Sequence, residues 1–203
     1  MEYFTQFPIT SALIAANIVA SLIAFSANDF FEQNLFRIAP VLKKGEWHRL
    51  VTSAFLHVNG LHLFVNMFVL FMFGPILERV LGAGGYLLVY FAALIGASLW
   101  MLADKRDSPD YSAVGASGAI SGVVLAFCLF QPFQMLYLFF ILPIPAVVFG
   151  IGYIALSFWL SRRESTMVAH GAHLGGALAG LAATVLVYPE VIGIFMRQLT
   201  GAA

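Results

Sequence analysis

Six apolar segments limit what this chain can fold into more than any other feature. They cover residues 9–27, 61–77, 85–103, 115–130, 134–160 and 170–188. About 20 apolar residues in a helix span the hydrocarbon core of a membrane. Lipid offers the backbone no hydrogen-bond partners, and the segments show no alternation of period two, so helices are the only candidates. We predict an all-α membrane protein: a six-transmembrane-helix bundle in one domain, 1–203, with its core at about 47–188.

Composition agrees with a membrane protein and excludes other classes. Of the 203 residues, 61% are hydrophobic and 10% are charged, whereas soluble domains carry about 25% charged residues. The formal net charge is zero, so no basic field would attract nucleic acid. Cys128 is the only cysteine, which excludes a disulfide or a cysteine-based metal site within the chain. We predict membrane lipid as the surroundings, with no nucleic-acid partner, no metal and no cofactor.

The segment lengths and flanks carry further expectations. The second and fourth segments are short, so one end of each should stop inside protein. The fifth is long enough to tilt, or to bend at Pro143 and Pro145. The first follows a stretch with Glu2 and no Lys or Arg, so we interpret it as a retained helix, not a signal peptide. The connection 28–60 mixes aromatic and charged residues, as expected of a membrane-embedded first loop.

Polar side chains inside the apolar segments are the candidate functional residues, because such groups are costly in lipid. Helices alternate in direction, so the second, fourth and sixth segments start on the same side of the membrane. Ser117 and His173 each lie roughly 5 Å below their helix starts. His62 and Asn66 are four residues apart and share one helix face. Four polar groups from three helices are therefore predicted to meet at one depth.

Small residues flank the predicted meeting point. The fourth and sixth segments both show the small-xxx-small spacing that lets membrane helices approach closely. Most of these glycines need do no more than pack helices, but close packing would also bring Ser117 to His173. The glycines expected at the site are Gly115, Gly118, Gly176 and Gly180.

This set of residues suits nucleophilic catalysis. Ser117 would be the nucleophile and His173 the base that takes its proton. His62, Asn66 and the backbone amide of Ser117, near a helix N-terminus, would stabilise an oxyanion. No acid is required to sit beside His173, so we predict a Ser-His dyad rather than a triad. The acids considered fall in loops or at segment ends: Glu78, Asp104, Asp107, Asp110 and Glu164.

Four motifs in this order resemble the rhomboid intramembrane serine proteases. They are HLFVN (62–66), GPILERVLG (74–82), GASG (115–118) and AHLGGALAG (172–180). The resemblance implies the same roles for Ser117, His173, His62 and Asn66. It also implies substrates that are themselves transmembrane helices, cut near one membrane face. Helix five would act as a lateral gate and the loop 161–169 as a cap.

Three positions depart from the family pattern. Ser121 stands where many relatives have a tyrosine that stacks on the catalytic histidine, so we expect a different orientation of His173. The usual Trp-Arg pair of the first loop is interrupted by His48, and His170 adds an ionisable group one turn before His173. His48 and His57 are expected to be interfacial or solvated.

Alternative functions would account for fewer of these polar residues. A haem protein with His62 and His173 as axial ligands would leave Asn66 and GASG unexplained. A metalloprotease lacks its HExxH motif, and GASGA does not match the GxSxG elbow of soluble hydrolases. An inactive rhomboid relative that only binds transmembrane helices is the remaining alternative. The presence of both Ser117 and His173 argues against it.

Two arguments about membrane orientation conflict. The resemblance implies the family's usual arrangement, with the N-terminus in the cytoplasm and the active site toward the outside. Lys and Arg predict the reverse, because the active-site side would carry eight of them and the other side two. The eight are Arg37, Lys43, Lys44, Arg49, Lys105, Arg106, Arg162 and Arg163; the two are Arg79 and Arg197. We follow the family, and expect the plasma (inner) membrane of a prokaryote; the oligomeric state stays open.

Overall fold

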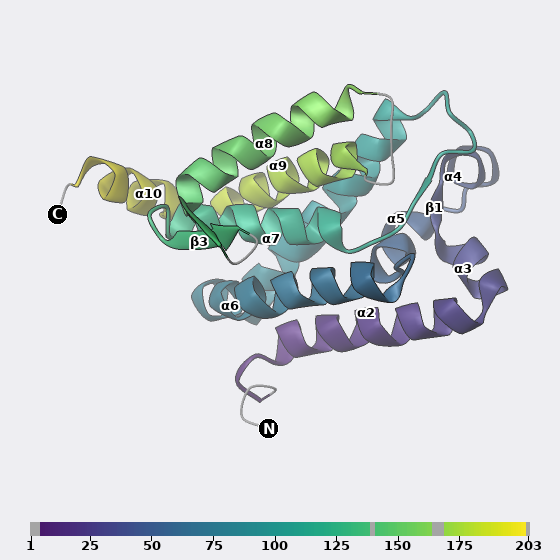
Figure 1. Cartoon of the computed structure of the whole chain (residues 1–203), viewed down its shortest axis with the longest axis horizontal. Helices are drawn as coiled ribbons and strands as arrows, with labels where there is room; N and C mark the ends of the chain where they lie inside the picture. Colours follow the sequence, from purple (N-terminus) through teal and green to yellow (C-terminus); the bar gives the residue numbers. More distant parts are fainter. Residues whose placement is uncertain (1–4, 139–140, 164–168, 202–203) are drawn as a thin grey trace.

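The computed structural model describes residues 5–138, 141–163 and 169–201, and these are mostly helical. Within these residues, three helices are apolar and long enough to cross a membrane: α2 (Pro8–Ser26), α6 (Gly60–Asp104) and α9 (His170–Val187). Two shorter apolar helices complete the bundle: α7 (Ser117–Phe130) and α8 (Ala146–Ser161). The chain is therefore a multi-pass membrane protein. In Figure 1, α6, α7 and α9 all begin at the same end of the bundle.

The 45-residue α6 is two helical halves joined at Gly82. Gly82 has φ 68° and ψ 170°, a conformation that only glycine adopts readily. A Cβ there would meet nothing within 4 Å, so the positive φ is what requires glycine. The two halves correspond to the predicted segments 61–77 and 85–103.

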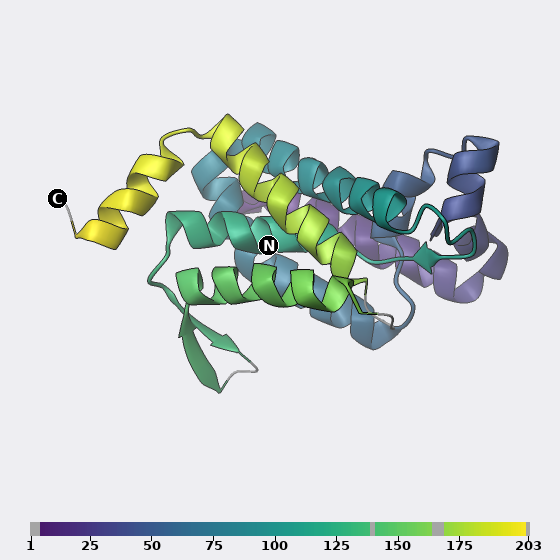
Figure 2. The same ribbon diagram turned by 90° about the horizontal axis from the view of Figure 1, so that it is seen from above.

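Helix α7 is the centre of the fold. Twelve of its 14 residues are buried, and it packs between α6 and α9 (Figure 2). The contact with α9 is made by glycines: a Cβ on Gly122 would lie 3.0 Å from Cα of Gly180. Protein encloses this helix, which agrees with the expectation from its short segment.

The prediction of one helix over 134–160 is wrong. A hairpin of β3 (Met135–Leu138) and β4 (Leu142–Pro145) precedes α8, with Met135 paired to Pro145. Figure 2 shows it projecting from the bundle beside the start of α8. Proline lacks an N–H and holds the residue before it in an extended conformation, so Pro143 and Pro145 exclude a helix before Ala146.

The first loop is an ordered structure. It contains three short helices and a 3-10 turn: α3 (Asn28–Asn34), α4 (Ile38–Lys44), α5 (Arg49–Thr52) and η1 (Ser53–Phe55). The strand β1 (Phe36–Arg37) pairs with β2 (Ser112–Ala113), so the sequence-based all-α description omits two small two-stranded sheets. This pairing ties the loop to the segment that leads into Ser117.

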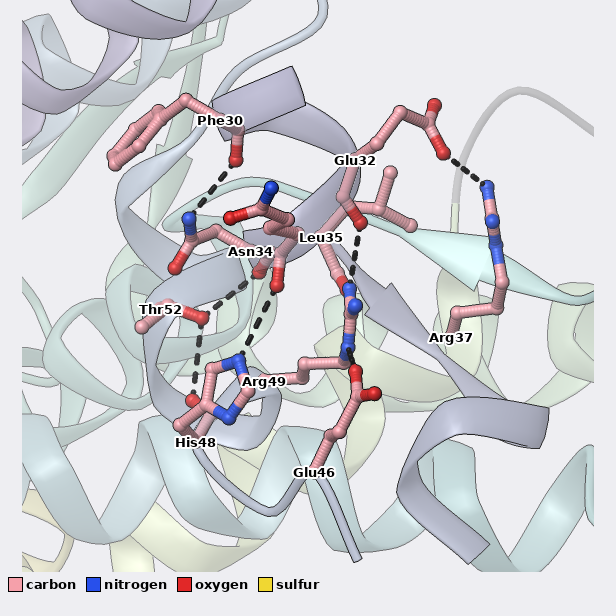
Figure 3. Close-up of polar contacts among 10 residues, drawn as sticks. Phe30, Glu32, Asn34, Leu35, Arg37, Glu46, His48, Arg49 and Thr52 are labelled. Atoms are coloured by element: carbon pink, nitrogen blue, oxygen red, sulfur yellow. Dashed lines mark hydrogen bonds and ion pairs between the residues drawn. The ribbon is translucent and has the colours of Figure 1, made fainter. Parts of the chain in front are cut away.

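Arg49 organises that loop from a buried position (Figure 3). Its guanidinium donates to the Glu46 carboxylate at 2.6 Å and to the carbonyls of Glu32 and Leu35 at 2.8 Å each. Thr52 Oγ1 donates to the carbonyl of Asn34 at 2.8 Å. The hydrogen bond from Arg49 holds the pKa of the Glu46 carboxyl below its ordinary value. One cation on the active-site side is therefore part of folded structure.

Glu78 caps the start of α2. Its carboxylate accepts from the backbone N–H groups of Ile9 and Thr10, both at 2.8 Å, and from the Thr10 hydroxyl at 2.7 Å. These N–H groups have no partner within their own helix, and a negative charge suits a helix N-terminus.

The last helix described is α10 (Val191–Thr200), which lies at the end of the bundle opposite the start of α7 (Figure 1).

Candidate active site

The structure brings Ser117 and His173 together. Ser117 is the first residue of α7, and His173 lies in the first turn of α9. The Oγ of Ser117 lies 2.8 Å from Nε2 of His173, a hydrogen-bond distance. Residues 56 apart in the chain therefore form a serine–imidazole pair.

Gly118 and Gly176 make this approach possible. A Cβ on Gly176 would clash with the backbone of Gly118, and a Cβ on Gly118 would lie 2.5 Å from Cβ of Ala97. The two backbones are thus in contact one residue after Ser117 and three residues after His173. Gly180 makes the same kind of contact one turn further on, with Gly122. Both α9 glycines face α7, as the sequence predicts.

Gly115 is required for two independent reasons. Its φ is +126°, which side chains rarely adopt. A Cβ there would also lie 2.7 Å from Cε1 and 2.9 Å from Nε2 of His62. The Nε2 edge of His62 therefore faces the backbone two residues before Ser117.

Asn66 is buried on the same face of α6 as His62. Its Nδ2 donates to the carbonyl of His62 at 2.9 Å, and Asn59 Oδ1 accepts from the amide of His62 at 2.8 Å. Because an amide carries two hydrogens on Nδ2, one stays available after the bond to His62. These bonds fix the turn of α6 that presents both candidate oxyanion donors.

The expectation that His57 is interfacial or solvated is wrong. His57 is completely buried, with its ring 4.9 Å from that of His62. Its Nδ1 lies 2.9 Å from Ser21 Oγ, whose hydroxyl donates to the carbonyl of Phe55 at 3.1 Å. Ser21 of α2 therefore lies within hydrogen-bond distance of the buried His57 ring. His48, by contrast, lies at the exposed edge of the loop, 3.2 Å from the carbonyl of Gln33.

Tyr153 is the residue of this region that sequence reasoning missed. Its ring stacks on His173, with centroids 6.2 Å apart and planes at 22°. Its hydroxyl lies 2.5 Å from Oγ of Ser121, where the rhomboid resemblance would lead one to expect a tyrosine. An aromatic ring thus contacts His173 from α8 instead of α7. The signal in the sequence was the absence of a tyrosine at 121.

Few ionisable groups lie around the His173 ring among the described residues. In the part of the chain that the structure describes, no carboxylate hydrogen-bonds to His173; Glu164 and most of the cap 161–169 lie outside those residues. His170 places its ring edge-on, 6.0 Å away. Over the same residues, no cluster of three or more His, Cys, Asp or Glu could hold a metal ion. The Nε2 of His173 faces Ser117.

A small cavity of about 30 Å³ lies beside Ser117. Gly115, Gly118, Ala97 and Ala172 contribute to its walls. A cavity of this size holds about one water molecule. The residue proposed as nucleophile therefore has free volume on one side, lined mostly by small residues.

Comparison with known proteins gives one consistent result. Residues 44–190 match the family model of the Rhomboid domain. The chain is 32% identical to RHOMBOID-like protein 12, mitochondrial, of Arabidopsis thaliana over 181 residues, which cover 81% of this chain and 54% of that protein. It is 33% identical to Rhomboid protease GluP of Bacillus subtilis over 165 residues, covering 80% and 30% of the two chains.

Rhomboid protease AarA of Providencia stuartii is 30% identical over 203 residues, covering 88% of this chain and 65% of that protein. The chain thus spans between 30% and 65% of the length of these three relatives. The family match covers most of the bundle and includes both Ser117 and His173. The chain belongs to the rhomboid family.

Proposed function

We propose that this protein is an intramembrane serine endopeptidase that hydrolyses peptide bonds in or near the transmembrane segments of membrane proteins. Ser117 is its nucleophile and His173 its general base. The observation that carries the proposal is the 2.8 Å distance between Ser117 Oγ and His173 Nε2. A serine hydroxyl is a weak nucleophile until a neighbouring base can take its proton.

The reaction follows from this pair. His173 Nε2 accepts the proton as Ser117 Oγ attacks the substrate carbonyl, which forms a covalent acyl-enzyme after the tetrahedral intermediate collapses. The imidazolium gives its proton to the leaving amine. A water then attacks the acyl group, with His173 again as base, and the carboxylic acid leaves. The cavity beside Ser117 offers a place for that water or for a small substrate side chain.

The oxyanion of the intermediate has three candidate donors. The backbone N–H of Ser117 is in the first turn of α7, where helix N–H groups lack partners within the helix. His62 Nε2 faces Gly115, and Asn66 keeps one free hydrogen on Nδ2. Removing a single such donor typically slows turnover by about 100- to 1000-fold.

The proposed unit is a dyad. In a triad, a carboxylate holds the imidazole from its other nitrogen. Over the described residues His173 has no such partner, which supports two-residue chemistry. His173 must then be held in place by other contacts.

We also propose the six-span arrangement: α2, the two halves of α6, α7, α8 and α9 each cross the membrane, and the first loop is embedded in it as part of one domain. A substrate helix would enter between α8 and the first half of α6. In the described part of the chain, α8 packs against α7 and α9 and makes no comparable contact with α6. The side of the bundle between α8 and the first half of α6 is therefore the entrance that we propose for substrates.

The test uses the protein in detergent with a fluorophosphonate, a small probe that bonds covalently to activated serines. We expect labelling at Ser117 and cleavage of a reporter membrane protein with a single transmembrane helix. Ser117→Ala should lose both, and His173→Ala should suppress both because the nucleophile loses its base. The exposed Ser26 supplies the matched control, since Ser26→Ala should label normally. Cleavage by the Ser117→Ala protein would overturn the proposal, and binding of the reporter without labelling would favour an inactive relative.

A further inference from the structure

We propose that Tyr153 of α8 is a positioning residue that holds the imidazole of His173 toward Ser117, so that the docking of α8 sets the geometry of the dyad. This inference rests on the proposed function. It assigns to α8 a role in the chemistry in addition to its role at the substrate entrance.

The first observation is the ring contact. Tyr153 and His173 are nearly parallel, with planes at 22° and centroids 6.2 Å apart. Phe149, one turn earlier on α8, stacks on Tyr153 at 5.7 Å and 24°. Offset-stacked rings attract each other beyond the effect of buried area. The face of the imidazole is therefore in contact with a ring that is itself supported by its own helix.

The second observation is the direction of the hydrogen bonds. Ser121 Oγ lies 2.7 Å from the carbonyl of Ser117 and donates its only hydrogen there. The hydroxyl of Tyr153, 2.5 Å from Ser121 Oγ, must then be the donor in that contact. The chain of hydrogen bonds runs from Tyr153 through Ser121 to the backbone of the nucleophile. Tyr153 thus stacks on His173 directly and is linked to the backbone of Ser117 through Ser121.

The third observation is what else holds His173. In the residues that the structure describes, Ser117 is the only hydrogen-bond partner of its ring. The terminal torsion of a histidine side chain has broad minima, so one hydrogen bond does not fix the ring plane. A stacked ring restricts that torsion. Tyr153 therefore supplies the orientation that an acid supplies in a triad.

Helix α8 fully buries only small side chains against the rest of the bundle, and the ring of Tyr153 is partly buried. Its buried residues are Ala146, Gly150 and Ser157, all of them small. The ring of Tyr153 is the large side chain that connects α8 to the dyad. When α8 moves away from α7 and α9, the stack on His173 must separate, so the dyad is fully ordered only while α8 is docked.

The experiment compares labelling rates of Ser117 by the fluorophosphonate in detergent, together with kcat and KM for the reporter substrate. Tyr153→Phe keeps the ring and loses one hydrogen bond, so labelling should fall by less than about tenfold. Tyr153→Leu keeps apolar volume but removes the ring, and labelling should fall about 100-fold, as for a misplacement of about 1 Å. We expect the loss in kcat rather than in KM. The matched control is Ile151→Ala, an exposed α8 position that should label normally.

Exchanging the two residues makes the test specific. The double variant Ser121→Tyr with Tyr153→Ser keeps the total volume and returns a ring to the same space from α7. It should recover labelling to within about tenfold of the unaltered protein if the ring is what matters. A merely structural defect would not be repaired by this exchange.

Three outcomes separate this inference from the function on which it rests. Normal labelling of Ser117 in the folded Tyr153→Leu protein would overturn the positioning role and leave the protease intact. Failure of the folded exchange variant to recover would do the same. Equal labelling of the Ser117→Ala and unaltered proteins would instead overturn the proposed function itself.

Discussion

Gly118 and Gly176 pack backbone against backbone, so that a Cβ on Gly176 would clash with the carbonyl of Gly118. Each glycine lies within three residues of one member of the Ser117–His173 pair. The distance between α7 and α9 at this point therefore controls the distance between the nucleophile and its base.

Gly176→Val is expected to reduce proteolysis about 100-fold, because even a shift of about 1 Å between catalytic groups has that effect. The protein should stay inserted in the membrane, since valine is apolar. Gly152→Val is the matched control, because a Cβ at Gly152 meets nothing within 4 Å. Cleavage of the reporter substrate by membranes containing each variant measures the difference. Equal cleavage by both variants would show that the dyad does not depend on this contact.

Asn66→Ala should lower turnover of the reporter by roughly 10- to 1000-fold, the range for one lost oxyanion donor. Labelling of Ser117 by the fluorophosphonate should persist in part, because the dyad itself is unchanged. The ratio of the two rates is the measurement. Complete loss of labelling would mean that Asn66 acts on the fold or on the dyad instead.

Single substitutions of the loop acids should leave most of the activity in place if the unit is a dyad. The variants are Asp104→Ala, Asp107→Ala, Asp110→Ala and Glu164→Ala. Asp104 is the most informative of them, because its Oδ2 lies 3.7 Å from where a Cβ on Gly171 would be, at the start of α9. Its carboxylate already pairs with Lys105 at 3.0 Å. Near-total loss of cleavage in any one variant would show that this acid is needed, as the third member of a triad would be.

Gly150→Cys gives a reversible lock between α8 and α7. A Cβ at Gly150 would lie 3.6 Å from Cβ of Cys128, within the range of disulfides. Because Cys128 is the only native cysteine, no other pair can form within the chain. Oxidation should stop cleavage of the reporter helix but leave labelling of Ser117 by the small probe, since Tyr153 stays on His173. A reductant should restore cleavage.

Full cleavage by the oxidised protein would show that substrates do not displace α8. Loss of labelling on oxidation would show that the cross-link disturbs the dyad. Cys128→Ala combined with Gly150→Cys is the control, since this protein cannot form the bond and should respond to neither oxidant nor reductant.

The C-terminus is expected in the cytoplasm, with the active site toward the opposite side, in the plasma membrane of a prokaryote. The loops around the active site carry most of the Lys and Arg, but Arg49 is buried and Arg37 pairs with Glu32 at 2.9 Å. Folded residues of this kind are not the free flanking charges that set orientation. Reporter fusions after Ala203 measure the location. A C-terminal reporter that is active only outside the cytoplasm would show that the protein has the opposite orientation.

Much of the candidate site can be predicted from the sequence. The alternation of helix directions, the depth of Ser117 and His173 and the glycine spacing all follow from counting residues along helices. Burying a polar group in a membrane is costly, so those present in the apolar segments formed a short list. The rhomboid resemblance drawn from the same residues is confirmed by the family match.

The sequence-based prediction was wrong where an apolar segment is compatible with more than one secondary structure. The segment 134–160 is apolar throughout, and a strand pair and a helix both satisfy that pattern. Pro143 and Pro145 decided the matter in favour of a hairpin. The sequence predicts an interfacial or solvated His57, but the side chain is buried beside Ser21 of α2.

Residue order alone predicts which side chains are candidates for chemistry, because the rise per residue of a helix and the cost of burying a polar group are local properties. The contact of Tyr153 on α8 with His173 follows only from how the helices pack. In a soluble helix an amphipathic pattern shows which face turns inward. In a membrane helix the face toward lipid is as apolar as the face toward protein. The rotation of α8 that puts Tyr153 against His173 therefore leaves no mark on the hydrophobicity of its sequence and is fixed only by the packing of whole helices.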